Sequence, residues 1–311
     1  MTSPRFAFID IGTNTILCLV AELRNGGRFR VLDDLAEITR LGQGVDRTGV
    51  VSCEGEQRTS DVLRRYLDTC KTLGVEQIIA VGTSALRDAQ NSGEIRQRWR
   101  AQLGLDVRVI AGHEEAAYSF LAVQRGLPLG GQELLVVDIG GGSTEFIRGN
   151  QSGVFQAVSM NLGSVRLTER FLGSDPVSDD EFATMTAVID RELQAMEQPW
   201  AQVAARSTWV GIAGTFTTLA AVEMKLARYS HSRVHGCILT LEEVQRQVRL
   251  FQSKTVADRR TIVGLEPNRA DIILAGACLI ERMMMLFGAR QVIVSDQGVR
   301  YGLLYERLGR I

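Results

Sequence analysis

The sequence contains little of what marks several large classes of protein. Its five cysteines are odd in number, scattered and without any CxxC spacing, which argues against a disulfide framework and a structural zinc site. No apolar run reaches the roughly 18 residues that span a bilayer, and the N-terminus lacks a basic region followed by an apolar stretch. Together these absences predict a cytoplasmic protein that has no membrane partner.

A large net charge is also absent. The chain has 35 lysines and arginines against 36 aspartates and glutamates, a formal net charge of −1. Without a long-range field, neither nucleic acid nor an anionic membrane is attracted to the molecule as a whole. We therefore expect no nucleic-acid partner, and any polyanionic ligand must be met by a local cluster of donors.

What the sequence does contain is a globular composition and an internal repeat. Hydrophobic residues make up 45% and charged residues 23% of the chain, close to the globular average, and a length of 311 residues favours two domains. Each half begins with three strand-like stretches and continues with alternating strand and helix patterns. The repeat predicts two α/β domains, residues 1–127 and 128–311, with the final helix either in the second domain or packed back on the first.

Three turns share one design, in which an apolar strand ends in glycines and hydroxyl residues. They read DIGTNT from Asp10, DIGGGST from Asp138 and GIAGTFTT from Gly211. Glycine permits a positive φ and leaves backbone N–H groups uncovered, so such a turn can bind an anion. A lone triple glycine is read more simply as a tight hairpin, but the repetition favours two loops that face each other across a phosphate-binding cleft.

The acids at the start of two of these turns indicate a metal. Neither a Walker lysine nor a GxGxxG motif accompanies the glycines, so neither a P-loop nor a dinucleotide-binding fold is supported. An acid directly before a phosphate cradle would repel the ligand unless a cation lay between them. Asp10 and Asp138 therefore predict a divalent metal, with Mg²⁺ as the default. Glu145 would return to the same cleft if this segment forms a hairpin.

The motifs of the chain resemble, in order, those of a known family. FAFIDIGTNT, AVGTSALRDAQN, VIAGHEEA, VVDIGGGSTEF, GIAGTFTTLAA and VSDQGVRYGLL are similar to motifs of the exopolyphosphatase and guanosine pentaphosphate phosphohydrolase (Ppx/GppA) family. The resemblance covers nearly the whole chain. It implies the α/β fold of the actin, sugar kinase and heat-shock ATPase superfamily, with two ribonuclease-H-like domains around a central cleft. Longer members carry further helical domains, so the resemblance is to a short form.

The resemblance implies a catalytic role for Glu115, which Glu145 would share, and a phosphate-binding role for Arg87. Glu115 corresponds to the family's general base, which activates water, whereas Glu114 would point about 100° away on the same helix. Without the resemblance, this acidic pair would be explained by the helix dipole alone. Arg87 corresponds to an arginine that clamps phosphate through its planar guanidinium, and a surface salt bridge is its alternative reading.

Metal and phosphate ligands follow from the same resemblance. Asp138 and Glu145 would hold Mg²⁺, with Asp10 as a further ligand, and Glu145 would share in positioning the water. Phosphoanhydride hydrolysis needs the charge of the transferred phosphoryl group to be neutralised by metal and fixed donors. The residues expected to contact phosphate are Thr13, Asn14, Arg87, Gly140, Gly141, Gly142, Ser143, Thr144, Gly214 and Thr215.

The leading functional prediction is an exopolyphosphatase, which hydrolyses the terminal phosphate of inorganic polyphosphate. The 5′-phosphate of guanosine pentaphosphate is the alternative substrate, and a non-catalytic receptor for guanosine tetraphosphate or polyphosphate is an alternative of another class. A kinase of the same superfamily is a third alternative. Because few arginines are available to bind the phosphates of a polyanion, we expect the protein to prefer short polyphosphate chains.

Three further features leave alternatives open. The family often has arginine or another polar residue where this chain has Leu17, and glutamate where it has Tyr301, so details of substrate recognition depend on these positions. The helix that contains ERMMMLFG is apolar on several faces. Its three methionines indicate either buried core or a subunit contact, as in a homodimer.

Overall fold

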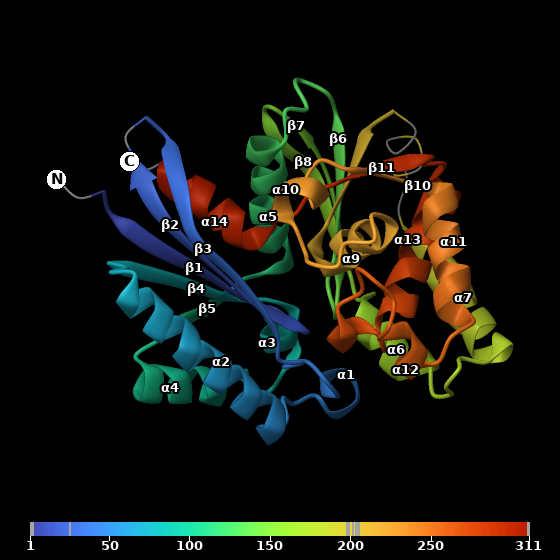
Figure 1. The fold of residues 1–311 in the computed structure, drawn as a ribbon, viewed down its shortest axis with the longest axis horizontal. Helices are drawn as coiled ribbons and strands as arrows, with labels where there is room; N and C mark the ends of the chain where they lie inside the picture. The colour runs from blue at the N-terminus through green and yellow to red at the C-terminus, as the bar shows by residue number, and fades with distance from the viewer. Residues whose placement is uncertain (1–2, 25, 197–199, 201, 203–205, 310–311) are drawn as a thin grey trace. The chain divides into compact units, whose positions relative to one another are not determined.

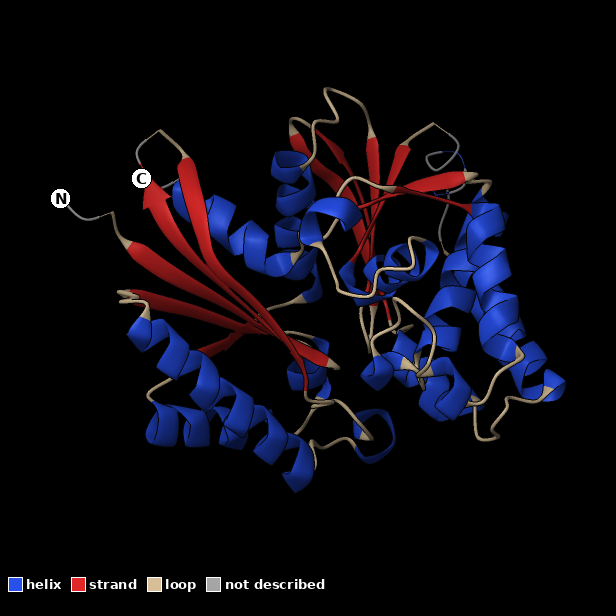
Figure 2. Ribbon diagram, viewed as in Figure 1, coloured by secondary structure: helices blue, strands red, loops and turns tan. Residues whose placement is uncertain are grey.

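The computed structural model describes residues 3–24, 26–196, 200, 202 and 206–309 (Figures 1 and 2). Its contacts divide the chain into two compact units. The first comprises residues 1–122 together with 299–311, and the second comprises residues 123–298. The last helix therefore belongs, by its contacts, with the first unit. The domain boundary placed after residue 127 from the sequence stays a prediction.

The first unit is built on a five-stranded mixed sheet with the order β3-β2-β1-β4-β5. β2 runs antiparallel to β1 and β3, whereas β4 is parallel to β1 and β5 is parallel to β4. The strands are β1 (Arg5–Ile11), β2 (Thr15–Arg24), β3 (Arg28–Ile38), β4 (Gln77–Gly82) and β5 (Val107–Val109). The helices are α1 (Val45–Thr48), α2 (Cys53–Thr72), α3 (Ser84–Asp88), α4 (Ser92–Leu103), α14 (Val299–Leu308) and α5 (Gly112–Gly126), whose last residues enter the second unit.

Alternate residues of β1 face two different helix layers. Ala7, Ile9 and Ile11 are buried in the core that includes α2 and α4 residues, whereas Phe6 and Phe8 are buried in the core that includes residues of α14. Figure 1 shows these two layers on opposite faces of the sheet. Because side chains alternate along a strand, an even-numbered residue such as Asp10 lies on the α14 face.

The second unit repeats this architecture with a six-stranded sheet in the order β10-β11-β9-β6-β7-β8. β7 runs antiparallel to β6 and β8, β9 is parallel to β6, and β11 is parallel to β9. The strands are β6 (Leu134–Ile139), β7 (Thr144–Asn150), β8 (Gly153–Met160), β9 (Thr208–Ile212), β10 (Ile238–Thr240) and β11 (Gln291–Val294). The helices are α6 (Ser164–Phe171), α7 (Asp179–Gln194), α9 (Ala213–Glu223), α10 (His231–Val234), α11 (Leu241–Gln252), α12 (Val256–Arg259), α13 (Ile273–Phe287) and a 3₁₀ turn at Pro267–Arg269.

The two sheets confirm the predicted fold class. The order β8-β7-β6-β9-β11 repeats β3-β2-β1-β4-β5 strand for strand, including the single antiparallel strand in second place, and β10 is added beyond β11. Two duplicated α/β units of the ribonuclease-H type are therefore present, as the internal repeat predicted.

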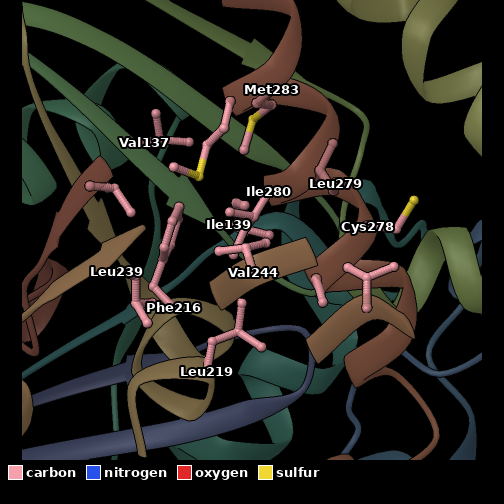
Figure 3. Packing of buried hydrophobic residues seen from close by; sticks show 14 of the residues in the cluster. Val137, Ile139, Phe216, Leu219, Leu239, Val244, Cys278, Leu279, Ile280 and Met283 are labelled. Carbon is pink, nitrogen blue, oxygen red and sulfur yellow. The ribbon is translucent and has the colours of Figure 1, made fainter. Parts of the chain in front are cut away.

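The core of the second unit explains most of the methionine-rich helix. Val137 and Ile139 of β6 pack with Phe216 and Leu219 of α9 and with residues of α13 (Figure 3). On α13, Met283 and Met284 are fully buried, so the core interpretation is confirmed for these two. Met285 is 44% exposed.

Helix α14 is tied to the first unit by a buried charged cluster. Arg300 forms a bidentate salt bridge with Asp34 of β3, at Nε–Oδ1 2.9 Å and Nη2–Oδ2 3.1 Å. The hydroxyl of Tyr301 donates to the same carboxylate at 3.0 Å. All three side chains are largely removed from solvent. Tyr301, one of the departures from the family pattern, therefore has a structural role in holding α14.

Gly302 of α14 supports a prediction about stability. A Cβ at this position would lie 2.1 Å from the carbonyl oxygen of Tyr118 on α5, and backbone cannot yield as a side chain can. We expect Gly302→Ala to lower the free energy of unfolding by about 1–3 kcal/mol, as overpacking does, measured by urea unfolding. Gly93→Ala is the control, because nothing lies within 4 Å of that site in α4. Equal stability of both variants would contradict the close contact.

Within the described part of the chain, no helix combines the length and the apolarity needed to cross a bilayer.

Candidate active site

Two acids meet at the end of the first hairpin of the second unit. Asp138 on β6 is the direct cross-strand partner of Glu145 on β7, so their side chains share one face of the sheet with Cβ atoms about 4.5–5.5 Å apart. Asp138 is 7% and Glu145 is 1% exposed. The hairpin that the sequence predicted for this segment is confirmed, and it brings the two carboxylates together.

The glycine loop between these acids is shaped by its own backbone and by the start of α6. Gly140 N–H donates to Ser143 O at 2.9 Å, and the N–H groups of Ser164 and Val165 donate to Gly140 O and Gly141 O. Gly163 approaches so closely that a Cβ there would lie 2.4 Å from Gly141 O. Gly140 does not adopt a positive φ, and a Cβ there would lie 3.3 Å from Ser143 O, so the tight turn leaves little room for a side chain at this position.

The hydroxyls of this loop are not equivalent. Thr144 is fully buried and donates to Leu162 O at 2.7 Å, which ties the start of β7 to the segment before α6. Ser143, also buried, precedes β7 at the tip of the loop. The Thr144 hydroxyl therefore stabilises the loop. The phosphate contacts expected of Gly140, Gly141, Gly142, Ser143 and Thr144 stay predictions.

The third glycine turn contains a strained residue and an arginine that the sequence analysis did not single out. Ala213 has φ 70°, a left-handed conformation that is costly for a residue with a side chain. A Cβ on Gly214 would lie 2.2–2.5 Å from the guanidinium of Arg269, so the arginine packs directly on this turn. Burial lowers the pKa of Arg269, and the Glu266 carboxylate opposes that shift. Thr215 is buried beside Gly276.

The first unit places its own acid and turn in equivalent positions. Asp10 is the second-last residue of β1, as Asp138 is of β6, and its cross-strand partner is Leu17. Leu17 thus occupies the position that Glu145 has in the second unit. The carbonyl of Thr13 accepts from Gly42 N–H at 2.8 Å, and the carbonyl of Asn14 accepts from the N–H groups of residues 39 and 40 at 3.0 Å. Both side chains are buried.

The predicted general base of the first unit, Glu115, and the predicted phosphate-binding Arg87 contact each other. Arg87 of α3 donates from Nη1 to Glu115 Oε2 at 3.0 Å and to Ile110 O at 3.0 Å. The Glu115 side chain is 10% exposed and the Arg87 side chain 25%. The elements that carry them follow the parallel strands β4 and β5, and ligands of α/β proteins bind at this carboxyl edge of a sheet.

Glu114 has a different environment from its neighbour. Its carboxylate accepts from Ala111 N–H at 3.0 Å and pairs with Arg108. The hydrogen bond from Ala111 lowers the pKa of Glu114, and the bond from Arg108 adds to that shift. As predicted from helix geometry, the two adjacent glutamates diverge, and Glu114 stabilises the first turn of α5.

Helix α4 contains several arginines, and their partners decide how much positive charge it offers. Arg98 makes a bidentate pair with Glu56, with both N–O distances at 2.7 Å, and also lies near Glu94. Arg96 donates to Val107 O at 3.4 Å. The charge of Arg98 is therefore balanced by acids within the same unit.

The donor set of the second unit fits a magnesium ion. Among the described residues, no group of three or more His, Cys, Asp or Glu side chains is placed to hold a metal. The pair Asp138 and Glu145 supplies carboxylate oxygens only, and Mg²⁺ is usually held by one or two carboxylates together with waters and substrate phosphates. Two buried acids on paired strands also repel each other unless a proton or cation lies near them.

The fold and these groups define an α/β protein with two ribonuclease-H-like units. In each unit an aspartate precedes a glycine-containing loop. The Ppx/GppA phosphatase family matches residues 19–311, so the chain belongs to this family. Exopolyphosphatase 2 of Mycobacterium tuberculosis is 34% identical, across 99% of this chain and 100% of that protein.

Solved structures agree with this assignment. An exopolyphosphatase from Cytophaga hutchinsonii aligns with a TM-score of 0.89 and 31% identity over 99% of this chain and 98% of that one. The Ppx/GppA family member from Aquifex aeolicus aligns with a TM-score of 0.82 and 33% identity, covering 99% and 98% of the two chains.

Proposed function

We propose that this protein is a magnesium-dependent exopolyphosphatase, a hydrolase that releases the terminal phosphate of inorganic polyphosphate. The observation that carries the proposal is the pairing of the buried carboxylates Asp138 and Glu145 beside a glycine loop. Membership of a phosphatase family and a relative named exopolyphosphatase at 34% identity support it.

Asp138 and Glu145 are the residues that would hold Mg²⁺. When bound, the metal supplies positive charge that neutralises the phosphate oxygens as the bond to the terminal phosphoryl group breaks. The backbone N–H groups of residues 141–143 would bind the remaining oxygens, because fixed backbone donors need no reorganisation during the reaction. Thr13 and Asn14 supply the equivalent turn in the first unit, and Gly214 and Thr215 supply the third.

Glu115 is proposed to orient the attacking water and to accept its proton. Arg87 holds the Glu115 carboxylate in one rotamer by the 3.0 Å bond from Nη1. Arg87 donates both of these hydrogen bonds, to Ile110 O and to Glu115 Oε2, from Nη1. We therefore assign phosphate binding to the other edge of its guanidinium, formed by Nε and Nη2. Arg87 then has two functions, to position the base and to bind the substrate.

The test is phosphate release from polyphosphate of defined length, with guanosine pentaphosphate as the competing substrate. We expect faster release from polyphosphate under equal conditions. A clear preference for guanosine pentaphosphate would replace the substrate while keeping the reaction. Binding of either compound without hydrolysis would favour a receptor and contradict the proposal.

Metal removal gives a separate prediction. After treatment with a chelator, activity should fall to background and return with added Mg²⁺. Ca²⁺ should restore much less, because it takes more ligands at longer distances than the octahedral Mg²⁺. The measurement is initial phosphate release against metal concentration. Full activity in the chelator would rule out the metal-dependent mechanism.

A further inference from the structure

Strand β8 extends the pair of acids into a row across three strands. Asp138 on β6 is opposite Glu145 on β7, and Glu145 is in turn opposite Ser159 on β8. The Ser159 hydroxyl donates to Glu145 Oε1 at 2.7 Å. Ser159 is exposed on the edge strand of the sheet, whereas Glu145 is 1% exposed.

This hydrogen bond acts on the last torsion of the buried Glu145 side chain. The last torsion of glutamate is broad and roughly two-fold, so packing alone defines the plane of its carboxylate weakly. A donor on Oε1 favours one orientation of the carboxylate and makes its two oxygens inequivalent, because Oε1 accepts the bond from Ser159.

We propose that Ser159 is a positioning residue of the magnesium site. It would act through Glu145, one of the two carboxylates proposed to hold the ion, as hydrogen-bonding partners of metal ligands commonly do. The inference rests on the proposed function, because it assumes that Asp138 and Glu145 hold the metal. It adds a residue of β8 that neither the glycine motif nor its acids would indicate.

The test measures metal affinity directly. Mn²⁺ is the probe, because it shares the oxygen preference of Mg²⁺ and its free form is counted by electron paramagnetic resonance. We expect Ser159→Ala to weaken Mn²⁺ binding by about 10- to 100-fold, the usual effect of removing such a partner. The Mg²⁺ concentration for half-maximal phosphate release should rise in parallel, with a smaller change in the rate at saturating Mg²⁺.

Two variants make the result specific to the hydroxyl. Ser159→Thr keeps the donor and suits a strand, so it should restore Mn²⁺ binding to within a few-fold of the wild type. Ser152→Ala, in the turn before β8, is the matched control. Ser152 donates a hydrogen bond to Asn150 Oδ1 through its backbone N–H, which alanine keeps. It should bind Mn²⁺ as the wild type does.

The outcomes separate this inference from the proposed function. If the wild type binds no Mn²⁺ and its activity ignores Mg²⁺, the magnesium mechanism itself fails. If the wild type behaves as proposed and Ser159→Ala binds Mn²⁺ equally well, only the role of Ser159 is overturned. Weakened binding in both Ser159→Ala and Ser159→Thr would overturn it as well, because the hydroxyl would then not be the cause.

Discussion

Glu115→Gln is expected to reduce phosphate release from polyphosphate by about 10²- to 10⁴-fold at saturating Mg²⁺, the usual effect of losing a general base. Glutamine has nearly the same shape, and its amide oxygen can still accept the bond from Arg87 Nη1 that Glu115 now accepts at 3.0 Å. It cannot take a proton from water. The loss should therefore appear in kcat, with little change in KM.

The neighbouring acid provides the control. Glu114→Gln removes a carboxylate of the same chemistry one residue away, but Glu114 binds Ala111 N–H and Arg108 and has no proposed part in the reaction. It should keep kcat within about threefold of the wild type, because no catalytic group is removed. Thermal unfolding of both variants should stay within a few degrees of the wild type. Near-normal turnover by folded Glu115→Gln would exclude Glu115 as the base.

Most of the fold could be predicted because its signals are local. Strands such as β1 and β6 appear in the sequence as apolar runs, and amphipathic helices such as α2 appear as apolar residues at helical spacing. Neither signal needs tertiary information. The short elements could not be predicted in this way. β10 has three residues and α10 has four, and both owe their conformation to neighbours, such as the pairing of β10 with β11.

In the candidate site too, residues placed by local structure could be predicted from the sequence, and residues placed by tertiary contacts could not. Asp138 and Glu145 could be paired from the sequence, because a short hairpin fixes which residues face each other. Arg87 could be named by resemblance, but its bond to Glu115 joins two segments far apart in the chain. Ser159 had no motif of its own, and no role was assigned to Arg269 from the sequence. Their positions follow from a strand register and from contact with Gly214, which only the folded chain defines.

Asp138→Ala should raise the Mg²⁺ concentration for half-maximal activity by about 100-fold or more. Loss of a partner that only orients a ligand costs about 10- to 100-fold, and removal of a direct ligand should cost at least as much. Alanine leaves the Glu115 and Arg87 pair of the first unit intact, so part of the rate should return at high Mg²⁺. The measurement is phosphate release against Mg²⁺ concentration, together with Mn²⁺ binding.

The control for this variant is Glu133→Gln. Glu133 immediately precedes β6 and pairs with Arg148 of β7. The substitution therefore removes one negative charge from the same hairpin and leaves the proposed metal ligands unchanged. Its Mg²⁺ requirement should match the wild type. If Asp138→Ala also matched the wild type, the metal would lie elsewhere, and Asp10 would be the next ligand to test. A comparable loss in Asp10→Asn, with none in Asp138→Ala, would assign the ion to the acid of the first unit.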